Sequence, residues 1–277
     1  MTNFICVTCG TQFSASEHAP DHCPICEDER QYVNPDGQQW TTLEDLRTTH
    51  SNTIRLEEAG LYGIGSTPRF AIGQRALLVQ HPEGNMLWDC VSLLDEATIK
   101  RVNELGGIQK IVISHPHFYS SMIEWAHEFG ASIHLPAADQ QWINRPDPSI
   151  QFWDGDNLEL QPGLRVIRCA GHFDGSSVLH WQVGANGQGV LLTGDTITVV
   201  ADRRFLTFMR SYPNQIPLHP EAIHRIWSAV EPLRFERIYG GWWDAIVSEQ
   251  ARERVRISAE RYLRAIGYED DSGLHKG

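Results

Sequence analysis

The chain has 277 residues, of which 41% are hydrophobic and 21% charged, and its formal net charge is −12. This composition is typical of a globular protein with one large domain or two unequal ones. The acidic excess disfavours nucleic acid as a partner, because it repels the phosphate backbone. The start, MTNFICVTCG, has no signal-peptide pattern, and no apolar run is long enough to span a membrane. We therefore expect a cytoplasmic protein with no membrane partner.

Two Cys-x-x-Cys pairs lie close to the amino terminus, Cys6 with Cys9 and Cys23 with Cys26. Each pair forms a tight turn that aims two thiolates at one point, and two facing turns complete a tetrahedral tetrathiolate site. Disulfides are disfavoured in a reducing cytoplasm, so the spacing predicts a metal site. Zinc is the favoured ion and iron is the alternative.

Residues 4–34 resemble a zinc ribbon, and the two knuckles are equally similar to the rubredoxin-like modules of rubrerythrins. We predict a tetra-Cys module over residues 1–45 and a main domain over residues 46–277. So short a module cannot bury a large core, so a bound metal is expected to supply much of its folding energy. A structural role is favoured, and electron delivery is the alternative.

Strand-like and helical patterns alternate from residue 75 onward, which is typical of an α/β fold. Residues 76–80 and 86–90 read as the two strands of a hairpin. A helix is expected over residues 95–105, with Gly106 and Gly107 as its stop. Further helical patterns cover residues 121–129, 220–230 and 247–266.

Potential metal ligands follow three of the predicted strands. His115 and His117 come after the strand at 111–113, His172 follows the strand at 164–169, and Asp195 follows the strand at 190–192. Functional side chains often lie at the carboxyl ends of strands in α/β proteins. Three imidazoles and one carboxylate form a donor set suited to a borderline metal ion, zinc or iron, with room for a water molecule.

This order of residues resembles the metallo-β-lactamase superfamily over about residues 54–266. The resemblance implies an αββα sandwich. His115 and His117 match the first two histidines of the family motif His-x-His-x-Asp-His, and His172 and Asp195 match the third histidine of metal site one and the bridging aspartate. Asp89 matches an aspartate that supports the site in the family.

Two departures from the family pattern affect the second metal site. Tyr119 and Ser120 stand where the family has Asp-His, and Gly240-Gly241 stands where it has a late Gly-His. The resemblance therefore implies one metal at site one and the loss of most of the second site. His219, Asp174 and Asp244 could rebuild part of it, but we expect them to be solvated or to cap helices.

A single zinc ion would suit the hydrolysis of a small ester, thioester, lactone or amide. Asp195 would orient the attacking water or complete the metal shell, and Tyr119 would serve as a proton donor or oxyanion partner. One alternative is a mononuclear iron redox enzyme resembling sulfur dioxygenases, with His115, His172 and Asp195 as ligands. Another is a catalytically inactive metal-binding relative.

Several other residues carry weaker expectations. Trp242 and Trp243 are predicted to line a substrate pocket, with a place in the core as the alternative. Arg203 is predicted to bind a substrate carboxylate, with a solvated position as the alternative. Cys90 and Cys169 lie in apolar runs and are expected to be buried thiols.

Overall fold

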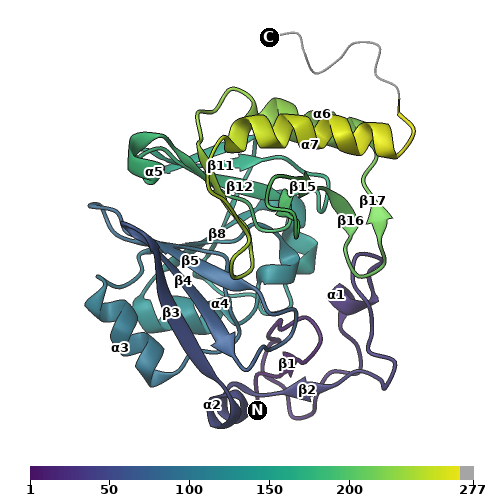
Figure 1. Cartoon of the computed structure of the whole chain (residues 1–277). Helices are drawn as coiled ribbons and strands as arrows, with labels where there is room; N and C mark the ends of the chain where they lie inside the picture. Colours follow the sequence, from purple (N-terminus) through teal and green to yellow (C-terminus); the bar gives the residue numbers. More distant parts are fainter. Residues whose placement is uncertain (269–277) are drawn as a thin grey trace. The chain divides into compact units, whose positions relative to one another are not determined.

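The computed structural model describes residues 1–268, and the chain forms two compact units, Met1–Asp154 and Gly155–Gly277. Each unit contains one large β-sheet with helices packed against it (Figure 1). The tetra-Cys segment belongs to the first unit, and its predicted boundary near residue 45 stays a prediction.

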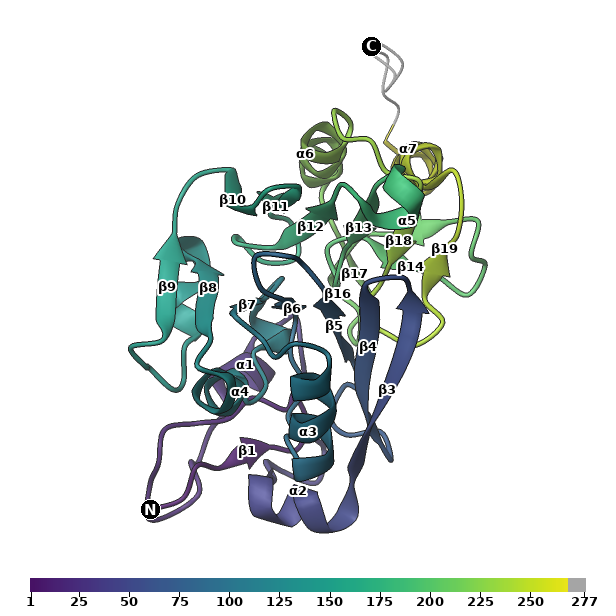
Figure 2. The same cartoon turned by 90° about the vertical axis from the view of Figure 1, so that its left-hand side faces the viewer.

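The tetra-Cys segment has a small core of its own. Strand β1 (Ile5–Cys6) pairs antiparallel with β2 (Trp40–Thr41), and helix α1 (Pro24–Glu27) contains Cys26 and begins directly after Cys23 (purple in Figure 2). The four cysteines pack there with Phe13 and Ile25. Helix α2 (Leu43–Thr49) follows, and the side chain of Thr42 caps it by accepting the N–H of Asp45.

The first unit is built on a seven-stranded sheet whose strands follow one another in chain order. The strands are β3 (Ser51–Glu58), β4 (Leu61–Thr67), β5 (Arg75–Val79), β6 (Met86–Trp88), β7 (Lys110–Val112), β8 (Ser132–Pro136) and β9 (Ile150–Trp153). Pairing is antiparallel from β3 to β6 and parallel from β6 to β9. The predicted hairpin is confirmed as β5 and β6.

Two α-helices of this unit match the predicted positions. Helix α3 (Glu96–Glu104) begins where the side chain of Asp95 accepts the N–H of Thr98, and α4 (Met122–Phe129) packs on β7 and β8. Two 3₁₀ turns, η1 (Pro116–Phe118) and η2 (Ala137–Trp142), follow β7 and β8. Turn η1 therefore places the His-x-His segment at the carboxyl end of a buried parallel strand.

The second unit contains a six-stranded sheet in the order β10-β11-β12-β13-β18-β19. The strands are β10 (Asn157–Gln161), β11 (Leu164–Arg168), β12 (Ser177–Trp181), β13 (Val190–Leu192), β18 (Arg237–Tyr239) and β19 (Ile246–Val247). Only β13 and β18 pair in parallel within this sheet. The shorter elements are α5 (Gly184–Gly187), β14 (Thr198–Val199), β15 (Leu206–Thr207), β16 (Met209–Ser211) and β17 (Ile216–Pro217).

Helices α6 (Pro220–Val230) and α7 (Ala251–Ala265) pack against each other and on this sheet (Figure 1). Apolar residues of α6 such as Ile226 and of α7 such as Val255 share one core with Ile238 of β18. The helix predicted from residue 247 begins four residues later, because residues 246–247 pair with β18 as strand β19.

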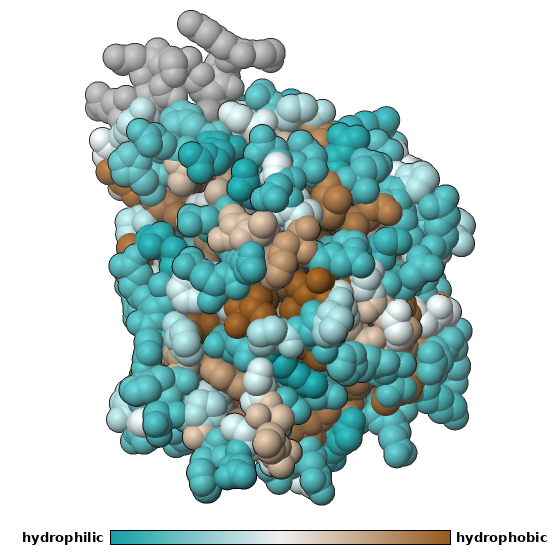
Figure 3. All heavy atoms as spheres, turned by 180° about the vertical axis from the view of Figure 1, so that it is seen from behind, coloured by the Kyte–Doolittle hydropathy of each residue, from teal (hydrophilic) through white to brown (hydrophobic). Residues whose placement is uncertain are grey.

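Most of the surface in the view of Figure 3 is hydrophilic, with apolar residues gathered near its middle. Within residues 1–268, the structure contains no helix with the length and apolar character needed to cross a membrane.

Candidate metal centre

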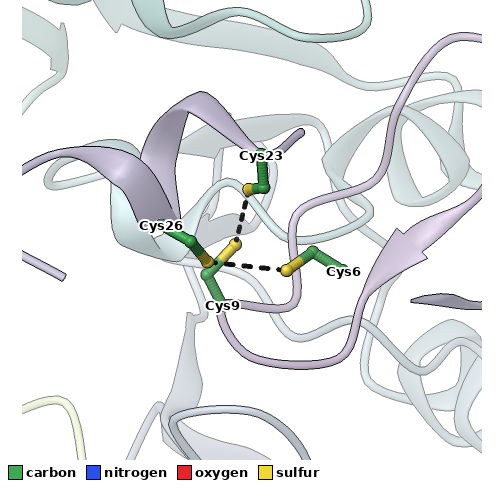
Figure 4. A group of neighbouring side chains, drawn as sticks. All are labelled: Cys6, Cys9, Cys23 and Cys26. Atoms are coloured by element: carbon green, nitrogen blue, oxygen red, sulfur yellow. Dashed lines mark hydrogen bonds between the residues drawn. The ribbon is translucent and has the colours of Figure 1, made fainter. Parts of the chain in front are cut away.

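The four cysteines of the amino-terminal module converge on one point (Figure 4). All four Sγ atoms lie within 4.8 Å of one another, with 3.6 Å between Cys6 and Cys26 and 3.7 Å between Cys9 and Cys23. A tetrahedral ion with metal–sulfur bonds of about 2.3 Å requires sulfur separations of about 3.8 Å. The cluster therefore fits a tetrahedral metal ion.

The surroundings of the cluster suit bound thiolates. All four cysteine side chains are buried, and the Nε2 of Gln38 donates to the Sγ of Cys6 over 3.1 Å. Hydrogen bonds among the four thiols, those with Cys23 first, lower the pKa of Cys6 and raise the pKa of Cys9 and of Cys26. His18 and His22, which lie between the two cysteine pairs, are exposed, and His22 contacts Glu27 on the surface.

The first half of the candidate His/Asp site lies just beyond β7. The carboxylate of Asp89 accepts the backbone N–H of Ser114 over 2.8 Å, and the Ser114 hydroxyl lies 2.8 Å from Nδ1 of His115. Asp89 itself is buried and has a positive φ of 61°. This arrangement supports the family role expected of Asp89, since it fixes the backbone next to a predicted ligand.

The imidazoles of His115 and His117 are neighbours, with ring centroids 5.2 Å apart. Both side chains are buried, and burial lowers the pKa of His115 to about 3. The imidazole of His115 is therefore neutral at physiological pH. A neutral imidazole is the form that binds a metal ion.

The second half of the candidate site lies in the second unit. The Nδ1 of His172 donates to the backbone carbonyl of Met209 over 3.0 Å, so Nε2 carries the lone pair of the neutral ring. That Nε2 lies 3.9 Å from Oδ2 of Asp195. Burial raises the pKa of Asp195 to about 6, against a smaller lowering by His172, so the carboxylate is ionised at neutral pH.

Tyr212 holds both residues of this half, and sequence reasoning missed it. Its hydroxyl donates to the backbone carbonyl of Asp195 over 2.9 Å, and its ring centroid lies 5.7 Å from that of His172. No sequence signal could have found the Met209 carbonyl, because any residue offers that group. Tyr212 and Ser114 belong to no sequence motif that would have marked them. Ser114 does, however, directly precede His115.

Tyr119 and Ser120, which replace the family's Asp-His, are buried and hydrogen-bonded inside the first unit. The Tyr119 hydroxyl is buried and donates to the backbone carbonyl of Asp139 over 3.4 Å, and burial raises the Tyr119 pKa. The Ser120 hydroxyl donates to the Cys90 carbonyl over 3.2 Å and accepts the Nε2 of Gln74 over 2.9 Å. A catalytic role for Tyr119 stays a prediction.

The remaining predicted residues have varied positions. Trp242 and Trp243 are half-buried in the turn between β18 and β19, where Trp242 packs against the core. Arg203 is exposed and donates to the Val200 carbonyl. Cys90 and Cys169 are buried as expected. The side chains that might have rebuilt a second metal site are solvent-exposed, as anticipated: Asp174, His219 and Asp244.

A family model described as the metallo-beta-lactamase superfamily matches residues 59–209, which is more than half of the chain. The chain belongs to this superfamily. The matched region contains Asp89 and all four candidate ligands, and these four side chains are buried residues of types that bind metal. Three imidazoles and one carboxylate form a donor set that can hold a metal ion.

Comparisons with individual proteins agree with this assignment. The chain is 50% identical over 271 residues to the uncharacterized protein YmaE of Bacillus subtilis (strain 168), covering 97% of this chain and 98% of the relative. A crystal structure of VMB-1 matches with a TM-score of 0.57 at 13% identity, over 78% of this chain and 98% of that one. The mono-zinc form of the metallo-β-lactamase FIM-1 from Pseudomonas aeruginosa matches with a TM-score of 0.56 at 15% identity, over 77% and 96%. The chain has the mixed α/β fold of these two solved structures.

Proposed function

We propose that this superfamily member is a hydrolase with a single catalytic metal, held by His115, His117, His172 and Asp195. The main support is the hydrogen bond from Nδ1 of His172 to the Met209 carbonyl, because it leaves Nε2 as the nitrogen that can bind metal. The contact between Ser114 and His115 gives the first unit a similar support. Such outer contacts orient the ligands of catalytic zinc sites.

Zinc bound by these residues would acidify a water molecule and polarise a substrate carbonyl. The chain's own part is to orient the ligands and to place a carboxylate beside them. Asp195 serves this second purpose, since it is ionised above about pH 6 and lies next to His172. Its carboxylate can accept a hydrogen bond from the attacking water and so direct one lone pair of that water at the carbonyl.

Few side chains remain that could bind a second metal ion beside the one at the His/Asp site. Ser120 and Gly241 stand where the family supplies histidines, and the Ser120 hydroxyl is already bonded to Cys90 and Gln74. We therefore infer a mononuclear reaction on a small ester, thioester, lactone or amide. Trp242, Trp243 and Arg203 are the proposed substrate-binding residues, and Tyr119 is a proposed proton donor.

The tetra-Cys site is proposed to hold a structural zinc ion. Its sulfur separations suit zinc and iron equally. Zinc is preferred because the cluster forms the core of a short module, and a structural ion can supply the folding energy that such a core lacks.

The test of this function is a hydrolysis assay on the zinc-loaded full chain with a panel of aryl esters, thioesters, lactones and amides. We expect at least one class to be turned over, with a loss of at least about 100-fold in His172→Ala. His134→Ala is the matched control, because His134 lies on β8 with its ring against Ser132. Activity that needs iron would favour the redox alternative, and metal binding without turnover would favour the inactive one.

A further inference from the structure

The tetra-Cys module binds directly to the loop that carries His117. The backbone N–H of Gln12 donates to the carbonyl of Ser120 over 3.0 Å. The side-chain amide of Gln12 donates to Glu124 of α4 over 3.2 Å and accepts a hydrogen bond from Arg145. Gln12 is buried by these contacts. A single residue of the module therefore bonds to the loop and to the helix that follows it.

A second contact joins the first cysteine knuckle to the segment after β6. The hydroxyl of Ser92 donates to the carbonyl of Gly10 over 2.7 Å. Gly10 has a φ of +83°, and a Cβ atom there would lie 2.7 Å from the same hydroxyl. Only glycine allows both the turn and this close approach. The knuckle that contains Cys9 and Gly10 thus packs closely against the segment that contains Ser92.

These contacts continue to the predicted metal ligands through a short hydrogen-bonded path. Gln74 donates to the Ser120 hydroxyl and to the Cys90 carbonyl, and Cys90 directly follows Asp89. Asp89 in turn fixes Ser114 next to His115. Ser120 has a positive φ of 47°, a strained conformation that needs support from its surroundings.

We propose that the tetra-Cys module is a metal-dependent clamp on the His115–Ser120 loop. With its own metal bound, the module holds Ser120 and thereby positions His115 and His117, so that metal at the tetra-Cys site increases metal affinity at the His/Asp site. The increase in metal affinity at the His/Asp site rests on the proposed function. Ser120, which occupies the place of a second-site ligand in the family, serves here as the docking point of the module.

The clamp predicts a coupling between two sites that do not touch. Coupling free energies of this kind typically change affinity by about 5-fold to 150-fold, and the effect is reciprocal. The zinc affinity of the His/Asp site should therefore fall at least about fivefold when the tetra-Cys site cannot bind metal. His115→Ala should weaken the tetra-Cys site by the same factor.

Hydrogen exchange of the backbone amides of residues 117–121, measured by mass spectrometry on the full chain, tests the clamp. In Cys9→Ser we expect these amides to exchange at least about tenfold faster than in the wild type. Cys169→Ser is the matched control, because it replaces a buried thiol in the second unit and leaves the module intact. The control should exchange in this segment as the wild type does.

Gln12→Ala provides a second variant in which all four cysteines remain. It should keep its tetra-Cys metal and still show faster exchange of residues 117–121, because it loses the side-chain bonds to Arg145 and Glu124. Wild-type exchange of this segment in both variants would overturn the clamp. Unchanged metal content in His115→Ala would instead reject the proposed function, and the exchange result would stand by itself.

Discussion

Ser114 joins the structural aspartate to the first predicted metal ligand, His115. Its backbone N–H is bonded to Asp89 and its hydroxyl contacts Nδ1 of His115, each over 2.8 Å. The strand β7, the carboxylate and the imidazole are thereby connected through one small residue. The orientation of His115 depends on this contact, and removing it should be visible in metal binding.

Ser114→Ala should weaken zinc binding at the His/Asp site by about 10-fold to 100-fold, the range typical of lost outer contacts to a metal-binding histidine. A competition titration with a chromogenic chelator measures this affinity. Ser132→Ala is the control, because Ser132 contacts the Nε2 of His134 over 2.9 Å in the same sheet. An equal affinity in the two variants would rule out the positioning role of Ser114.

Tyr212→Phe should weaken the same metal site from the second unit. The variant loses the hydrogen bond to the Asp195 carbonyl, worth about 1 kcal/mol in folding stability. Tyr262→Phe loses a similar bond, to the N–H of Leu218. We expect urea unfolding to show similar destabilisation of both variants, and isothermal titration to show weaker zinc binding in Tyr212→Phe alone. Weaker binding in both would indicate a general loss of stability.

Asp195→Asn should stabilise the metal-free protein at neutral pH. The folded-state pKa of Asp195 is about 6, above the value of 3.8 for an exposed carboxyl. Between these pH values the unfolded chain ionises first, so the folded state loses stability as the pH rises, by about 3 kcal/mol once the pH exceeds 6. Asparagine carries no charge and avoids this loss.

Urea unfolding of chelator-treated wild type and Asp195→Asn, measured from pH 4 to pH 8, checks this result. The stabilities should converge near pH 4 and separate above pH 6, with the variant more stable. His115, whose pKa is lowered to about 3, affects both proteins equally. A wild type more stable than the variant at pH 7 without metal would contradict the burial effect.

Asp89→Asn should fold, whereas Asp89→Ala should lose about 3 kcal/mol or more. Asparagine tolerates the positive φ of 61° at this position and keeps an acceptor for the Ser114 N–H. Alanine leaves a buried N–H without that acceptor and is strained by the same φ. Thermal unfolding measures the difference, and equal melting temperatures of the two variants would show that the side-chain acceptor at position 89 does not support the loop.

The sequence predicted the elements whose pattern is local. The helix at Glu96–Glu104 has its cap and glycine stop, and the hairpin at Arg75–Val79 and Met86–Trp88 has strong apolar strands. The short strands escaped prediction, as β16 and β17 did, because two or three residues show no periodicity and depend on their pairing partner. Strand pairing also moved the start of the last helix, since the β-branched Ile246 and Val247 pair with β18 as a strand.

The sequence predicted the four candidate ligands of the site, because their residue types are typical of metal ligands. It did not predict the backbone and hydroxyl groups that support them. His115, His117, His172 and Asp195 each follow a strand, and their order matches a family motif. The supports of these residues come from a carbonyl at Met209 and hydroxyls at Ser114 and Tyr212, which carry no spacing rule. The docking of Gln12 on Ser120 joins segments more than one hundred residues apart, which no local pattern records.

We propose that the chain holds one metal ion at the His/Asp set and a second at the four cysteines. Metal content per chain, measured by mass spectrometry on the wild type, His115→Ala and Cys9→Ser after zinc loading and desalting, tests it most directly. We predict two zinc ions in the wild type and one in His115→Ala, with weakened retention of the remaining ion in Cys9→Ser. Two ions retained in His115→Ala, or a single ion in the wild type, would show that this assignment of the two metal sites is wrong.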